Sequence, residues 1–204
     1  MRFVSLYLRS RRVPMAAAIA IGAVVLTWVS FPSFSDGQVI NARMLSVTVL
    51  IAAVALGTTL SGPDDALDHS ASARWPVRRA VHLLLTAAAI IALLQASTVT
   101  DARFEPLGVV LRNTAGLLGL TALGAVLLGA ALSWIAPLTW TLIAIMPWMG
   151  PSDQLRMQLS AWQIQPVDNT AATVCATVLA VAGLTAYTLR GCPLRPATET
   201  VPER

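Results

Sequence analysis

The sequence contains no lysine, and only 12% of its residues carry a charge. Each shortage excludes a class of protein. A phosphate-binding loop uses a lysine to reach the β- and γ-phosphates of a nucleotide, so this chain cannot hydrolyse ATP by that route. A soluble domain has about a quarter of its residues charged. Because hydrophobic residues make up 56% of this chain, lipid must be the solvent for most of it.

Histidine and cysteine are scarce as well. The only histidines, His69 and His82, lack the glutamate and second histidine of a zinc-protease motif. Cys175 and Cys192 do not suit a disulfide, because a helical rise of about 1.5 Å per residue separates them by roughly 25 Å. We therefore predict no catalytic, cofactor-binding or metal-ligating residues, and we expect that the chain is not an enzyme.

Long uncharged apolar segments are what the sequence has in abundance. A hydrocarbon core about 30 Å thick is crossed by about 20 helical residues. The uncharged stretch from 113 to 149 is too long for one crossing, and we divide it near Ser133. The predicted fold class is all-α, a polytopic transmembrane helical bundle of about six spans, which cover residues 13–31, 44–60, 80–96, 113–132, 134–149 and 170–189.

The sequence also predicts the character of the termini and of the connections outside these spans. Residues 1–12 place apolar side chains at helical spacing among four arginines, which predicts an amphipathic cytoplasmic segment on the membrane surface. A twin-arginine signal at residues 10–12 is the alternative, but no small-residue cleavage site follows. Residues 191–204 are predicted to be a disordered cytoplasmic tail. The connections at 98–112 and 150–169 are expected to be polar, the second with little room for re-entrant helices.

The positions of the arginines predict the orientation in the membrane. With the N-terminus inside, ten of the 14 arginines lie in cytoplasmic segments, and the outer segments hold Arg43, Arg103, Arg112 and Arg156. Arginine and lysine accumulate on the cytoplasmic side of membrane proteins. We therefore expect a multi-pass protein of the inner (plasma) membrane with both termini in the cytoplasm, and no nucleic-acid partner. No charged residue or histidine lies near the centre of a predicted span, which disfavours transport driven by a buried carboxylate.

Small residues recur at four-residue spacing inside the predicted spans. Such pairs let two helix backbones approach closely, so they predict tight packing within the bundle or with a second copy. The pairs are Ala18/Gly22, Ala115/Gly119, Ala125/Gly129 and Ala182/Ala186.

The charged loop at residues 62–82 is the best candidate for a functional segment. It is acidic at first and basic later, and Pro76 favours a bend or a fresh helix start within it. One interpretation is an ordinary positive-inside loop; the other is a cytoplasmic element that docks on a soluble partner. The charged residues of this candidate docking loop are Asp64, Asp65, Asp68, Arg74, Arg78 and Arg79.

Three stretches carry a resemblance to a known family: residues 73–82 (ARWPVRRAVH), residues 112–117 (RNTAGL), and the final span from Gln165-Pro166 through Tyr187 to residues 189–191. Together with the six-span pattern, the chain resembles ABC-2 type transporter permeases, and most closely small actinobacterial six-helix members of that kind. The resemblance implies a permease subunit, acting as an exporter and as a homodimer, with a separate ATPase that docks on the N-terminal helix and the 62–82 loop.

A second function class stays open beside this one. A non-transporting membrane protein, such as an assembly, immunity or sensory component that binds a neighbour, has the same composition and span pattern. Any ATP hydrolysis would belong to a partner subunit in either case.

Overall fold

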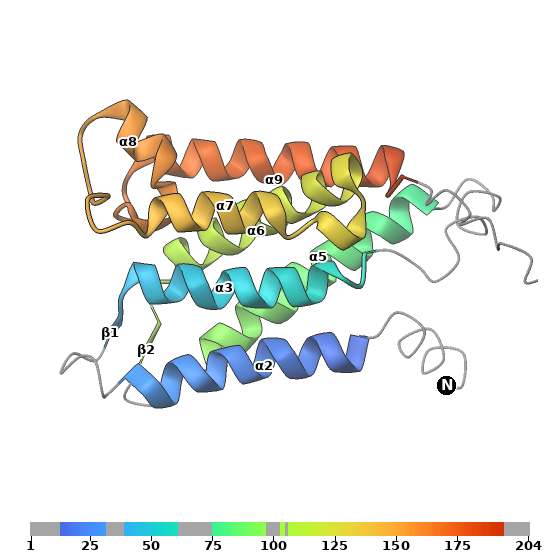
Figure 1. Cartoon of the computed structure of the whole chain (residues 1–204), viewed down its shortest axis with the longest axis horizontal. Helices are drawn as coiled ribbons and strands as arrows, with labels where there is room; N and C mark the ends of the chain where they lie inside the picture. The colour runs from blue at the N-terminus through green and yellow to red at the C-terminus, as the bar shows by residue number, and fades with distance from the viewer. Residues whose placement is uncertain (1–12, 32–38, 61–74, 97–102, 105, 194–204) are drawn as a thin grey trace, which may run out of the picture.

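The structure is a computed structural model, and it describes residues 13–31, 39–60, 75–96, 103–104 and 106–193. Helices that run side by side along one axis form a bundle (Figure 1). The six main helices are α2 (Val13–Ser30), α3 (Ala42–Gly57), α5 (Trp75–Gln95), α6 (Leu107–Leu128), α7 (Ile135–Ala144) and α9 (Thr170–Arg190). Shorter elements are η3 (Ala130–Leu132), α8 (Leu155–Ser160), η4 (Trp162–Ile164), β1 (Val39–Ile40) and β2 (Arg103–Phe104).

The predicted helical fold class is confirmed, and each predicted apolar segment contains a helix. Within the described residues, three helices are long and apolar enough to cross a membrane: Pro76–Gln95, Leu107–Leu128 and Thr170–Arg190. The apolar helices at Pro14–Ser30, Ala42–Gly57 and Ala130–Ala144 are shorter. The chain is thus built as a helical membrane protein.

The two ends of the bundle differ in the segments that they gather. At one end, the proximal end, α2 and α5 begin and α3 and α9 end (Figure 1). The opposite end, the distal end, holds α8 and the two strands. The strands pair in parallel, with Ile40 opposite Phe104, and so join the connection that precedes α3 to the one that precedes α6.

Several helix boundaries follow from local chemistry. Asn41 and Asn169 precede α3 and α9, and each side chain accepts a hydrogen bond from the backbone N–H three residues ahead, at 3.0 and 2.9 Å. After α6 the chain turns at Gly129, whose φ of 84° favours glycine. That turn lies a few residues before Ser133, where we predicted the division, because η3 intervenes between α6 and α7.

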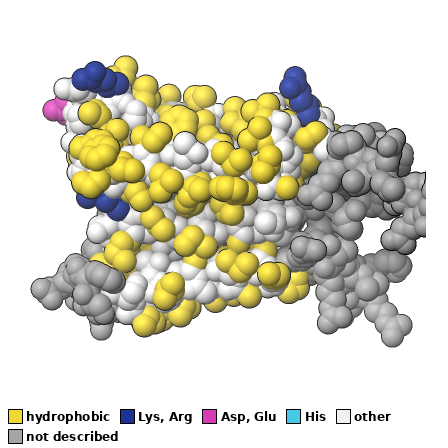
Figure 2. Space-filling model, viewed as in Figure 1, with side chains coloured by type: hydrophobic (Ala, Val, Ile, Leu, Met, Phe, Trp, Pro, Cys, Tyr) yellow, Lys and Arg dark blue, Asp and Glu magenta, His cyan; other side chains and the backbone are white. Residues whose placement is uncertain are grey.

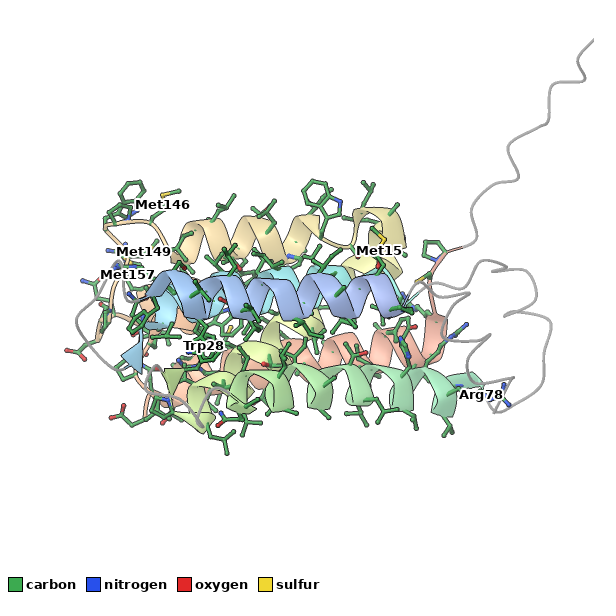
Figure 3. All side chains as sticks on the ribbon, turned by 90° about the horizontal axis from the view of Figure 1, so that it is seen from below. Met15, Trp28, Arg78, Met146, Met149 and Met157 are labelled. Atoms are coloured by element: carbon green, nitrogen blue, oxygen red, sulfur yellow. The ribbon has the colours of Figure 1, made fainter. Side chains whose placement is uncertain are left out.

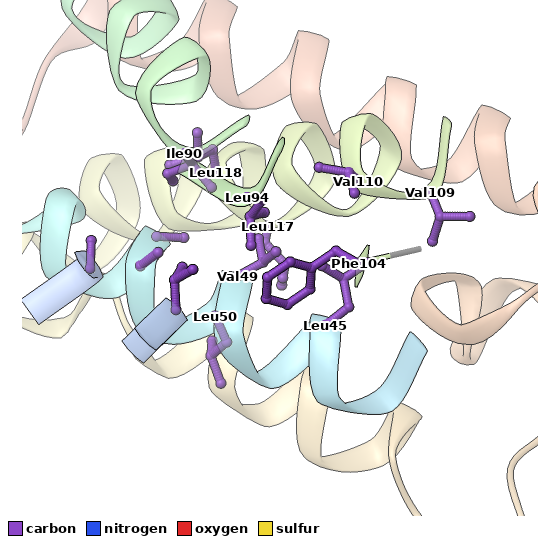
Figure 4. Packing of buried hydrophobic residues seen from close by; sticks show 14 of the residues in the cluster. Leu45, Val49, Leu50, Ile90, Leu94, Phe104, Val109, Val110, Leu117 and Leu118 are labelled. Atoms are coloured by element: carbon purple, nitrogen blue, oxygen red, sulfur yellow. The ribbon is translucent and has the colours of Figure 1, made fainter. Parts of the chain in front are cut away.

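The core of the bundle surrounds α6. Most of the α6 side chains are buried, whereas most of those on α5 and α9 are at least partly exposed. Leu45 and Val49 of α3 and Leu117 of α6 are fully buried in one apolar cluster, which Leu94 of α5 and Phe104 of β2 complete (Figure 4). Three separate parts of the chain, α3, α5 and β2, therefore close around the distal half of α6.

The helices α6 and α9 approach each other most closely at two glycines. A Cβ atom added to Gly183 would collide with the backbone of Gly119, and one added to Gly119 would collide with the backbone of Leu179 and Ala180. The small-residue prediction is confirmed at Gly119. At Gly22 a Cβ would meet no atom within 4 Å, so that pair makes no close contact within the bundle, and its packing against a second copy stays a prediction.

The outer surface of the bundle is apolar along its length. Side chains such as Leu26, Leu85, Leu127 and Val178 are more than half exposed. On the face in Figure 2, hydrophobic side chains cover the middle and the charged side chains lie near the two ends. A surface of this kind is rare on a soluble monomer, and lipid is the solvent that suits it.

Candidate functional site

The predicted docking loop is described only in part. Asp64, Asp65, Asp68 and Arg74 lie outside the described residues. Arg78 is exposed in the first turn of α5, at the proximal end and far from the methionines of the distal end (Figure 3). The described part of α5 begins at Trp75, and Pro76 lies in its first turn; the predicted bend or fresh helix start depends on residues before Trp75, which lie outside the described residues.

The guanidinium of Arg79 lies against the end of α9. A Cβ atom added to Gly191 would be 2.5 Å from the central carbon of that guanidinium. Gly191 has a φ of 69° and donates its N–H to the Tyr187 carbonyl at 3.0 Å, so it ends the helix. A positive charge is favourable beside the carbonyl end of a helix. Arg79 therefore ties α5 to α9, and Arg78 is the described arginine that the loop presents outward.

Thr59 and Leu60, which follow the end of α3, are held by both neighbouring helices. The Tyr187 hydroxyl of α9 donates to the Leu60 carbonyl at 2.6 Å. The Thr59 hydroxyl gives its one proton to the Leu56 carbonyl at 2.6 Å, so the His82 Nε2–H of α5 must donate to Thr59, at 2.9 Å. The Tyr187 bond ties the residue before the 61–74 segment to α9. The Thr59–His82 bond ties the chain before this segment to α5, which follows it. Sequence reasoning missed them, since apolar periodicity carries no sign of such pairings.

A second polar cluster lies at the distal end, where it corrects a prediction. We expected Arg112 in a polar outer connection, and that is wrong: α6 begins at Leu107, and Arg112 is buried in its second turn. One terminal nitrogen donates to the Pro166 carbonyl at 2.8 Å, and the other donates to the Gln165 carbonyl. Backbone carbonyls on a distant segment thus bind a cation that would otherwise need water.

The neighbouring Asn113 holds the same segment. Its Nδ2 donates to the Gln163 carbonyl at 3.0 Å and to the Ser46 hydroxyl of α3 at 3.3 Å. Residues 161–165 are buried among the helices, and α8 and η4 give this region helical turns. The predicted polar connection thus contains two short helices and a buried stretch, and its small room for re-entrant helices stays a prediction.

Two further side chains close the distal loop. Gln165 donates from Nε2 to the Gly150 carbonyl at 3.1 Å and accepts from the Ser152 N–H at 3.3 Å. Arg43 donates to the Met149 carbonyl at 2.6 Å. We call Arg43, Arg112, Asn113 and Gln165 the distal clamp, because together they bind backbone groups at both ends of residues 149–166.

The described residues contain no candidate metal centre. Across these ranges, no group of three or more histidine, cysteine, aspartate or glutamate side chains could hold a metal ion. Polar side chains instead organise the two ends of the bundle, the proximal end around Arg79 and Tyr187 and the distal end around the clamp. Comparison with protein-family models, curated proteins and solved structures finds no match to this chain.

Proposed function

We propose that the chain is the membrane-spanning subunit of an ABC transporter, an exporter that works with a separate ATPase subunit. In this proposal six helices cross the inner membrane, and the proximal end faces the cytoplasm with both termini. The proposal rests on the resemblance to ABC-2 type permeases and on the arrangement of the proximal end.

The distribution of arginine supports the orientation. Arg78, Arg79 and Arg190 belong to the proximal ends of α5 and α9. Arg112, which counted as an outer arginine, is buried and bound to carbonyls, so it is no longer a marker of the outer surface. The bias of positive charge toward the proximal end is correspondingly larger.

The observation that carries the transporter proposal is the anchoring of the docking loop. The Leu60 carbonyl is bound by Tyr187 of α9, and Arg79 at the start of α5 lies on Gly191 at the end of α9. A soluble subunit that moves this loop would therefore act on α3, α5 and α9 together. The α9 helix in turn contacts α6 through Gly183 and Gly119, which gives such a movement a rigid route into the bundle.

Reversing the charges of Arg74 and Arg78 should remove the ATPase subunit from the purified complex. Like charges brought together at an interface oppose binding, and we expect at least about a tenfold weakening, equivalent to about 1.4 kcal/mol. The measurement is the amount of ATPase subunit, and of ATP hydrolysis, that co-purifies with the tagged chain in mild detergent. Arg79 is left unchanged because it packs on α9.

Arg156→Glu is the matched control, since Arg156 is exposed in α8 at the distal end. It should retain the ATPase subunit at the level of the unmodified chain. Undiminished co-purification with the Arg74→Glu/Arg78→Glu variant, at normal membrane insertion, would contradict the docking role.

The non-transporting alternative is favoured by a different observation. Ala161, Trp162 and Gln163 are fully buried at the distal end, and the clamp holds their segment in place. A protein that only binds a neighbouring protein does not need to open a passage at the distal end. Reconstituted vesicles test it. If the chain recruits an ATPase subunit whether or not a substrate is present, and no transport follows, the result would support this alternative over the exporter.

A further inference from the structure

Several polar side-chain atoms in the distal half of the bundle are buried and lack a hydrogen-bond partner among the described residues. They include Asn113 Oδ1 and Thr114 Oγ1 of α6, Thr141 Oγ1 of α7, and Trp162 Nε1 with both amide atoms of Gln163 in η4. All of them lie on α6, α7 or η4. This concentration in one region calls for a physical cause.

Elsewhere the same fold satisfies its buried polar atoms. The Thr48 hydroxyl of α3 donates to the Met44 carbonyl at 2.8 Å, and the Thr121 hydroxyl of α6 donates to the Leu117 carbonyl at 2.8 Å. An unpaired polar group surrounded by lipid and protein is costly, because the bilayer core offers no water. The atoms around η4 are therefore unlike these two buried hydroxyls.

The unpaired atoms include both donors and acceptors, and the residues that carry them are neighbours. Asn113 lies beside Gln163 because its side-chain amide donates to the Gln163 backbone carbonyl. The six-membered ring of Trp162 lies against Gly116, one turn further along α6. Trp162 and the Gln163 amide supply N–H donors, and Asn113 and Gln163 supply carbonyl acceptors. A neutral set of this composition matches water, which makes about three hydrogen bonds in buried sites.

The set lies toward the distal end of α6. At a rise of about 1.5 Å per residue, Asn113 lies roughly 9 Å from the first residue of that helix.

We propose that water occupies a buried site between α6 and η4, bound by Asn113, Trp162 and Gln163. The site is a polar inclusion in an otherwise apolar bundle. It does not depend on the proposed transport function.

Hydroxyl-radical footprinting of the unmodified chain in lipid nanodiscs tests the site directly, because radicals formed from bound water oxidise the side chains beside it. Tyr187 is the internal control: it is as buried as Trp162, but its hydroxyl is bonded to the Leu60 carbonyl. The oxidation rate of each residue is divided by the oxidation rate of the same residue in the unfolded chain. We expect much weaker protection of Trp162 than of Tyr187. Equal protection of the two would overturn the proposal.

The Gln163→Met variant tests it independently, since methionine has a similar volume and no amide. If water binds the amide, its removal lowers the melting temperature by several degrees and slows the oxidation of Trp162. If the amide is dry, removing two unpaired polar atoms raises the melting temperature, and that result would overturn the proposal. Gln165→Met is the matched control, because its amide is bonded to Gly150 and Ser152; it should lower the melting temperature in either case.

Discussion

Gly183→Ala should separate α6 from α9 and destabilise the whole bundle. The added methyl group would meet the backbone of Gly119, which cannot rotate away as a side chain can. Alanine favours a helix over glycine by about 1 kcal/mol. The forced separation should exceed this gain, with a net loss of about 2–3 kcal/mol or more, as is typical of overpacked cores. The measurement is the melting temperature of the detergent-solubilised protein, together with its yield from membranes.

Gly22→Ala is the control for this substitution, since it makes the same chemical change in α2 where a Cβ meets no atom within 4 Å. It should be neutral or slightly stabilising. Gly119→Ala should resemble Gly183→Ala, because the collision there is also with backbone. If all three variants melted at the same temperature, the close approach of α6 and α9 would be refuted.

Arg112→Met should release the distal segment from α6. The substitution removes hydrogen bonds from a charged donor to the carbonyls of Gln165 and Pro166, each worth about 1.5–3 kcal/mol when buried. We expect a loss of about 3 kcal/mol or more, concentrated at the distal end. Limited digestion with trypsin reports it locally, because Arg156 is exposed in α8 and should be cleaved faster once residues 161–165 come loose.

Two comparisons make this result specific. Cleavage at Arg78, at the proximal end, should be unchanged in Arg112→Met. Arg112→Lys keeps the charge but lacks the planar fork that reaches two carbonyls, so its cleavage at Arg156 should be intermediate. An Arg112→Met protein cleaved at Arg156 no faster than the unmodified chain would exclude the clamp as the element that holds this segment.

The helices could be predicted from the sequence because lipid imposes a simple rule. Long uncharged segments must form helices to satisfy their backbone groups, and each predicted segment contains one. The error at α6 shows where the rule stops. Arg112 follows an apolar run that starts at Leu107, and a charge at the end of such a run is typical of a span boundary. Its partners at Gln165 and Pro166 lie more than 50 residues further along the chain, and nothing near Arg112 in the sequence indicates them.

The candidate sites were predictable to a smaller degree. The charges of residues 62–82 drew attention to the proximal end, yet the contacts that anchor this loop come from Thr59, His82 and Tyr187. Single hydroxyl and imidazole groups are common at helix ends, so their pairing emerges only from the packing. The close glycine pair illustrates the same limit, since Gly119 belongs to a small-residue motif whereas Gly183 does not. In the folded bundle, Gly119 of the motif packs against Gly183, which lies outside the motif.

The most direct test of the account is the side of the membrane on which each end of the bundle lies. In a chain with Cys175→Ala and Cys192→Ala, a single cysteine is introduced by Asp153→Cys at the distal end or by Thr198→Cys in the tail, and intact cells are treated with a membrane-impermeant thiol reagent. With the proximal end in the cytoplasm, the Asp153→Cys protein should react in intact cells, and the Thr198→Cys protein only after permeabilisation. Labelling of the Thr198→Cys protein in intact cells would contradict the orientation, and the ATPase docking site would then lie on the wrong side of the membrane.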